Sequence, residues 1–134
     1  AEDTRHPAKL MQMCNISTPM RSLHDQNELN RIEEILTLLN NDQSVAIISD
    51  AGTPLISDPG FKVIRALREE HKTIIPIPGV SALITALSVS GIATDRFSFE
   101  GFLPAKSTSR KTRMDELKND PRTLVFYESS HRHA

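Results

Sequence analysis

The stretch VAIISDAGTPLISDPGF at residues 45–61 joins four consecutive apolar residues to a loop rich in Asp, Gly and Pro. A short, continuous apolar run that ends at turn residues is typical of a strand covered on both faces, as in a parallel sheet. A helical pattern with Val63, Ile64 and Leu67 on one side follows the loop. The stretch therefore predicts a strand over 44–49, a shaped loop over 49–60 and a helix over 61–70.

The rest of the chain repeats this alternation. The helix expected over 28–40, capped by Asn27, carries a stripe of Leu29, Ile32, Ile35, Leu36 and Leu39, with Glu28 mostly outward. Short connections between alternating helices and strands favour an α/β fold with a parallel sheet between helix layers. The other expected helices cover 4–14 and 81–90, and the other expected strands cover 20–24, 73–77 and 97–99.

The sequence changes character at GFLP, residues 101–104. A basic run follows, then a helix to about residue 119 and a strand over 123–129. We therefore predict an N-terminal α/β domain over 1–100, and a linker with the beginning of a second, truncated α/β domain over 101–134. Because the chain starts without Met and stops just after a strong strand pattern, we expect a piece of a longer protein.

Composition limits the possible functions. The 134 residues are 38% hydrophobic and 25% charged with a formal net charge of −1, so overall charge offers no case for nucleic-acid binding. The apolar runs are too short to span a bilayer, and no secretion leader opens the chain. Cys14 excludes an internal disulfide and suggests a reducing compartment, hence the cytoplasm. Next to Met11 and Met13, Cys14 is expected to be a core residue.

Ligands of open α/β sheets bind beyond the carboxyl ends of the strands, where the loops 49–60 and 77–83 are expected. Gly52 would let the backbone approach a ligand, and Asp50 or Asp58 would face a cation or cap nearby N–H groups. The alternative is that Pro, Gly and Asp only shape turns there. Neither loop is a phosphate cradle of the GxGxxG or GxxxxGK[ST] type, and the five histidines form no metal-binding cluster, so no metal is expected.

Two further sets of charged residues are candidates for binding or catalysis. Glu2, Asp3 and Arg5 in AEDTRH would lie on the same rim of the sheet if a strand ends at Ala1; alternatively, Asp3 or Thr4 only caps the next helix. A cluster of cations after residue 105 is either a patch that contacts phosphates or a plain solvated surface. Its members are Lys106, Arg110, Lys111 and Arg113.

Six motifs, in one order and at matching spacing, make the chain resemble the bacterial 16S ribosomal RNA (cytidine) 2′-O-ribose methyltransferases. These enzymes are a branch of the tetrapyrrole methylase superfamily. The motifs are AEDTRH at 1–6, LHDQNE at 23–28, SDAGTPLISDPG at 49–60, PGVSALITAL at 78–87, FEGFLPAK at 99–106 and RTLVFYESSHR at 122–132. The resemblance covers essentially all 134 residues.

The resemblance implies two α/β domains that clasp S-adenosylmethionine, and usually a homodimer. It places the family's first strand before Ala1. The cofactor residues that it implies are Asp50, Ala51, Gly52, Thr53, Pro54, Ile56, Pro78, Val80, Ser81 and Ala82. The implied partner is 16S rRNA in the small ribosomal subunit, in the cytoplasm, with no membrane.

The resemblance and the sheet-rim position together suggest Glu2 or Asp3 as the residue that assists the ribose hydroxyl, with Arg5 near a phosphate. Glu128 and His131 are rivals for this role. Two other readings of the chain stay open. One is a methyltransferase that acts on a tetrapyrrole or another small molecule, and the other is an inactive truncated piece.

Overall fold

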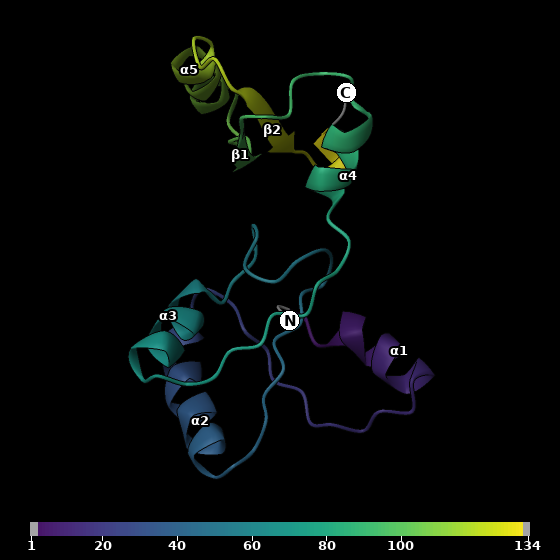
Figure 1. The fold of residues 1–134 in the computed structure, drawn as a ribbon, viewed down its shortest axis with the longest axis vertical. Coiled ribbons are helices and arrows are strands. Elements are labelled where there is room, and N and C mark those ends of the chain that lie inside the picture. Colours follow the sequence, from purple (N-terminus) through teal and green to yellow (C-terminus); the bar gives the residue numbers. More distant parts are fainter. Residues whose placement is uncertain (1–2, 133–134) are drawn as a thin grey trace. The chain divides into compact units, whose positions relative to one another are not determined.

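The computed structural model describes residues 3–132, apart from the side chains of His6 and Ser130. Two compact units, Ala1–Val80 and Ser81–Ala134, make up the chain. The domain boundary that we expect near residue 100 stays a prediction. The elements, in order, are α1 (Arg5–Met13), α2 (Glu28–Asn40), α3 (Phe61–Glu69), α4 (Ala82–Val89), β1 (Phe97–Phe102), α5 (Ser107–Leu117), β2 (Thr123–Tyr127) and the 3₁₀ turn η1 (Ser130–Arg132) (Figure 1).

The core of the first unit lies between α2 and α3, which run side by side (Figure 1). Val63 is fully buried there. The apolar stripes predicted for the two helices supply most of this core, which confirms their 3.6-residue period. The buried cluster consists of Leu23, Ile35, Val63 and Leu67, and Ile32, Leu36, Leu39, Ile47 and Ile64 pack against it.

The first turn of α2 differs from the prediction. Leu29 is 68% exposed, whereas Glu28 is only 3% exposed. Glu28 lies four residues before Ile32 and seven before Ile35, which places it on the buried face of the helix. The prediction of an outward Glu28 and an inward Leu29 was therefore wrong, because the helical period and not the polarity of the side chain decides which face is buried.

The strands predicted over 20–24, 44–49 and 73–77 are not present as hydrogen-bonded strands. A strand is stable only when a neighbouring strand satisfies its N–H and C=O groups, and none of these segments has such a ladder within residues 3–132. The segments still contribute apolar side chains, because Leu23 and Ile47 belong to or pack on the α2–α3 core.

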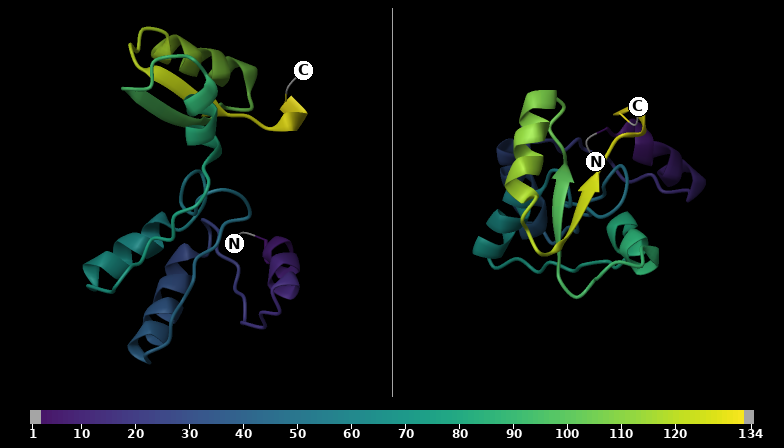
Figure 2. Two further views of the ribbon diagram at one scale, coloured as in Figure 1. Left: turned by 45° about the vertical axis from the view of Figure 1, so that its right-hand side comes forward. Right: turned by 90° about the horizontal axis from the view of Figure 1, so that it is seen from above.

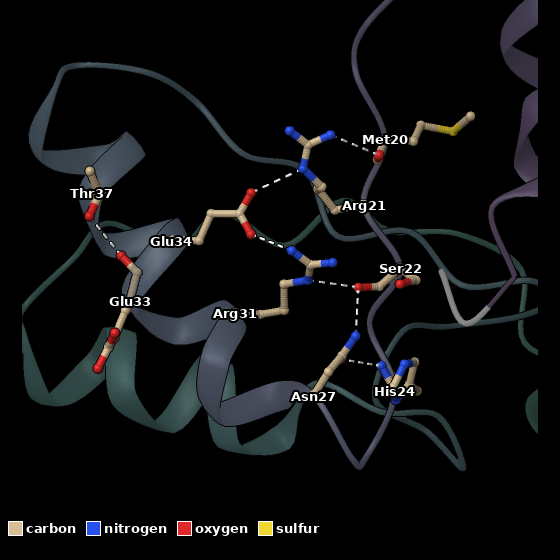
Figure 3. A network of polar contacts seen from close by, with 9 residues as sticks. All are labelled: Met20, Arg21, Ser22, His24, Asn27, Arg31, Glu33, Glu34 and Thr37. Carbon is tan, nitrogen blue, oxygen red and sulfur yellow. Dashed lines mark hydrogen bonds and ion pairs between the residues drawn. The ribbon is translucent and has the colours of Figure 1, made fainter.

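Side chains of α2 and its cap, rather than a sheet, hold the segment 20–24. The Ser22 carbonyl accepts from Asn27 Nδ2 at 3.2 Å and from Arg31 Nε at 3.0 Å, and the His24 N–H donates to Asn27 Oδ1 at 2.9 Å (Figure 3). Asn27 occupies the predicted N-cap position, but its side chain bonds this segment instead of the helix. Glu34 accepts from both Arg21 and Arg31, and these hydrogen bonds lower the pKa of Glu34, that from Arg31 most.

The second unit contains a β-α-β arrangement. β1 and β2 are parallel, and α5 connects them and lies beside the pair (Figure 2). Gly101, at φ +67°, produces a bulge that leaves Glu100 without an opposite residue. This parallel pair confirms the predicted α/β class, and β1 extends further than the expected 97–99.

The described part of α1 leaves apolar side chains uncovered. Leu10 is 61% and Met13 is 82% exposed, and Cys14 is exposed as well. The prediction of Cys14 as a core residue was wrong, because no described element packs over this end of the helix. No helix within the described residues is long and apolar enough to cross a membrane.

Candidate active site

The loop 49–60 turns sharply at its centre. The Ile56 N–H donates to the Thr53 carbonyl at 3.2 Å, with Pro54 and Leu55 in the middle of this turn. Leu55 has a φ of +71° and Ser57 a φ of +58°. Residues that carry a Cβ rarely adopt positive φ values, and backbone strain of this kind is found mainly at functional sites. The loop therefore has a specific conformation rather than that of a plain connection.

This loop and the segment before it form a small pocket with a cavity volume of about 10 Å³, about the space of one water molecule, so a cofactor would lie along the exposed face of the loop rather than inside this cavity. Asp50 and Pro54, two of the predicted cofactor residues, lie on its wall, and Asp58 contributes a second carboxylate. Nearby, the Asp3 N–H donates to Asp50 Oδ2 at 3.4 Å, so AEDTRH does meet this loop. The pocket is lined by Leu23, Ile47, Ile48, Ser49, Asp50, Pro54, Asp58 and Pro59.

The backbone at Gly52 is open to a ligand. Gly52 has a φ of +74°, and a Cβ built on it would meet no other atom within 4 Å. Ala51, Thr53 and Ile56 are exposed beside it, and Ser49 Oγ fixes the local backbone by donating to the Gly52 carbonyl at 2.9 Å. Carbonyl and carboxylate oxygens next to an open backbone fit a cationic ligand such as a sulfonium or an ammonium group.

The second candidate loop spans the end of one unit and the start of the next. Pro78 and Val80 are exposed at the end of the first unit, with Val80 at 88%. In the second unit, Ser81 caps α4 through Oγ, which accepts the Ile84 N–H at 3.5 Å, and this confirms the expected cap. Ala82 opens that helix and is exposed.

Asp3 and Arg5 of AEDTRH are bound to each other. Arg5 Nη2 lies 2.5 Å from Asp3 Oδ2, and the Arg5 N–H donates to Asp3 Oδ1 at 2.9 Å. The hydrogen bond with Asp3 raises the pKa of Arg5. Asp3 therefore accepts the N–H of the first residue of α1, whereas Thr4 is the N-cap and its side chain makes no cap hydrogen bond. Glu2 lies outside the described residues.

The four cations of the basic run in the second unit differ in their contacts: the two arginines have hydrogen-bond partners, and the two lysines are exposed. Arg110 donates to the carbonyls of Pro104 and Ala105, and Arg113 Nη2 donates to Glu100 Oε2 at 2.6 Å. Lys106 and Lys111 are exposed, and within residues 3–132 their amino groups form no ion pair. The two lysines are therefore the members of this run that are directly available to a phosphate.

The rival catalytic residues follow β2. Glu128 Oε1 lies 3.2 Å from Arg132 Nε and accepts the Ser129 N–H at 2.8 Å, and His131 is exposed. Arg132 Nη2 donates to the carbonyls of Leu103 and Pro104, which follow β1. The ends of the two parallel strands therefore share one polar cluster.

Sequence reasoning missed one residue that shapes the candidate site. The buried Glu28 accepts the Gly60 N–H on Oε1 at 2.6 Å, and its Oε2 lies 3.3 Å from Lys62 Nζ. Gly60 is both the last residue of the loop and the N-cap of α3. The signal that would have found Glu28 is its place in the buried period of α2.

The shaped loop after an apolar segment in the first unit and the parallel β-α-β arrangement in the second unit define an α/β protein. Comparison with known proteins identifies the family. A family model described as Tetrapyrrole (Corrin/Porphyrin) Methylases matches residues 1–134. The chain belongs to this family, so the predicted membership is confirmed.

Several curated relatives bear the name "Ribosomal RNA small subunit methyltransferase I". The chain is 54% identical to that of Xylella fastidiosa over 134 residues, which is 100% of this chain and 49% of the relative. It is 52% identical to that of Haemophilus influenzae over 132 residues, 98% of this chain and 47% of the relative. The chain spans about half the length of the curated relatives it matches.

Proposed function

We propose that this chain is part of an S-adenosylmethionine-dependent methyltransferase that modifies a ribose 2′-hydroxyl of a cytidine in 16S rRNA. The observation that carries the proposal is the identity of 54% over the whole chain to a relative named as a small-subunit ribosomal RNA methyltransferase. The small ribosomal subunit is the proposed substrate particle, the protein is a homodimer, and it acts in the cytoplasm.

The proposed cofactor wall consists of the loop 49–60 and the segment 78–82. Three features support it: the open backbone at Gly52, the carboxylates of Asp50 and Asp58 on one pocket, and the strained turn at Leu55. S-adenosylmethionine, when bound, supplies an electrophilic methyl group on a positively charged sulfur. Oxygen atoms of the loop would hold the cationic parts of the ligand, and Ser81 would keep the end of α4 in place.

The residues of the chain would contribute mainly orientation. Alignment of two reactants in a site is worth roughly 7–11 kcal/mol in favourable cases, and a positioned base adds about 10²–10⁴-fold. We assign the acceptance of the hydroxyl proton to Glu2 or Asp3, with Glu128 and His131 as rivals. Asp3 is supported by its place beside the pocket, because its backbone N–H donates to Asp50 on the pocket wall, and its carboxylate pairs with Arg5. Lys106 and Lys111, with Arg110 and Arg113, would bind RNA phosphates.

Tritiated methyl transfer tests the proposal. The protein, with any sequence that naturally flanks these 134 residues, is incubated with labelled S-adenosylmethionine and small ribosomal subunits that lack the modification. The 134-residue chain alone and a tetrapyrrole precursor are run in parallel. Label in a ribose of 16S rRNA is the expected result.

The second acceptor separates the two candidate reactions. The family description names corrins and porphyrins, which keeps a small-molecule methyltransferase as the second candidate. Label in the tetrapyrrole alone would support the proposed cofactor but would show that the substrate is a tetrapyrrole and not 16S rRNA. No transfer to either acceptor would contradict both.

A further inference from the structure

A buried carboxylate from α2 holds the far end of the candidate cofactor loop. Glu28 is 3% exposed and accepts the Gly60 N–H at 2.6 Å across 32 residues of sequence. A hydrogen bond to an ionised acceptor is roughly twice as strong as a neutral one. The α3 N-terminus, where Gly60 lies, also favours a negative charge. This contact is therefore a strong anchor at the last residue of the loop.

The surroundings of Gly60 leave it little freedom to move. Gly60 has a φ of +125°, and a Cβ there would lie 3.2 Å from Leu55 Cδ1 and 3.8 Å from Leu23 Cδ2. Lys62 Nζ lies 3.3 Å from the second carboxylate oxygen. Glu28 thus joins the loop end to the first turn of α3, at a point where Leu55 and Leu23 lie close to Gly60.

Asp58 and Pro59, directly before Gly60, line the same pocket as Asp50 and Pro54. At the start of the loop, Asp50 accepts the Asp3 N–H, and Ser49 binds the Gly52 carbonyl. The pocket therefore has one wall fixed near residues 49–52 and another fixed at residue 60.

We propose that Glu28 is a positioning residue for cofactor binding: its bond to the Gly60 N–H sets the Asp58–Pro59 wall of the pocket. The identity of the ligand in this inference rests on the proposed function. The role of Glu28 in holding the loop rests only on the contacts described above. Glu28 itself does not line the pocket, so it acts through the backbone of the loop.

The test compares Glu28→Ala and Glu28→Gln with the matched control Glu33→Ala in the protein with its natural flanking sequence. Glu33 lies on the same helix, is exposed, and directs its carboxylate away from the network in Figure 3. S-adenosylmethionine affinity is measured by calorimetry well below the unfolding midpoint. Hydrogen exchange of the peptide over 50–60 is followed by mass spectrometry.

Loss of the acceptor in Glu28→Ala is expected to weaken S-adenosylmethionine binding by up to about 10- to 100-fold, because the loop then occupies the binding conformation only part of the time and the lost hydrogen bond to a charged group limits the effect. Exchange over 50–60 should become faster, and Glu33→Ala should match the unaltered protein. Glu28→Gln keeps an acceptor oxygen and should lose less affinity, about threefold to tenfold. If Glu28→Ala does not fold, Glu28→Gln against Glu33→Ala decides.

Two results would overturn the inference. One is unchanged exchange over 50–60, and the other is faster exchange with unchanged affinity. A purely structural role would lower the unfolding midpoint and leave the affinity of the folded protein as it was. If the unaltered protein does not bind S-adenosylmethionine, the proposed function fails, and exchange over 50–60 alone then decides whether Glu28 holds the loop.

Discussion

Arg113 on α5 donates from Nη2 to Glu100 Oε2 at 2.6 Å, which connects the helix to the bulge of β1. Arg113 Nη1 also donates to Glu116 at 2.8 Å. Hydrogen bonds from Ser98 and then Arg113 lower the pKa of Glu100, whose side chain is only 10% exposed. Arg113 therefore has a structural partner, and the basic run is not a uniform surface of available cations.

Lys106→Ser with Lys111→Ser should reduce the salt dependence of RNA binding more than Arg113→Ser does. Each phosphate contact that is lost lowers the log–log slope by about 0.7–0.9. The measurement is binding of small-subunit RNA to the protein with its natural flanking sequence across a salt series. Equal slopes for the double lysine variant and the unaltered protein would show that the lysines are only a solvated surface.

Substitution of Arg122 should raise the pKa of Asp120. A side-chain hydrogen bond from Arg122 lowers the pKa of Asp120 from 3.8 to about 2. Because the folded value is depressed, the pair stabilises the fold above pH 3.8, and the contribution is lost as pH falls through about 2. An NMR titration of the carboxyl carbon in Arg122→Ala should show the pKa of Asp120 moving up from about 2 toward 3.8 without reaching it, because the backbone N–H of residue 122 and the charge of Arg96 still lower it. Arg68→Ala, in the other unit, serves as the control, and an unmoved Asp120 value in Arg122→Ala would contradict the assignment.

Val63→Ala should lower the free energy of unfolding by about 2 kcal/mol, because it removes two methyl groups from a fully buried site between α2 and α3. Ile75→Ala, at a position 73% exposed in the same unit, should change it by less than about 0.5 kcal/mol. Denaturant unfolding measures both. Similar losses for the two variants would mean that the α2–α3 contact is not the core of this unit.

Gly60→Ala should destabilise the fold by about 1–3 kcal/mol, since a side chain at φ +125° is strained and its Cβ would meet Leu55 at 3.2 Å. Gly79→Ala is the matched control. A Cβ at Gly79 would meet no atom within 4 Å, and its φ lies outside the positive region. Thermal unfolding of the two variants checks the difference, and equal midpoints would count against the described loop geometry.

Glu2→Gln or Asp3→Asn should lower turnover about 10²–10⁴-fold if one of these carboxylates accepts the hydroxyl proton. Single-turnover methyl transfer by the protein with its natural flanking sequence is the measurement. The parallel variants Glu128→Gln and His131→Ala test the rival residues. Full activity in both Glu2→Gln and Asp3→Asn would show that neither of these carboxylates accepts the hydroxyl proton.

The helices were predictable from the sequence, because their stability depends on local periodicity and caps. The period of α2 and α3 identified Ile35, Val63 and Leu67 as core residues, and Ser81 was recognised as a cap. The β-α-β order around α5 was also predictable from alternation. Family membership followed from six ordered motifs.

Contacts between distant residues were decided only by the tertiary structure. The burial of Glu28 depends on an N–H that lies 32 residues away, and the pairing of Arg113 depends on a bulge that redirects Glu100. The predicted strands over 44–49 and 73–77 also depend on a partner, because a strand forms no internal hydrogen bonds. Local pattern thus determined the helices and most of the apolar stripe between α2 and α3, whereas the burial of Glu28, the strand ladders, the bulge and the buried ion pairs required the folded chain.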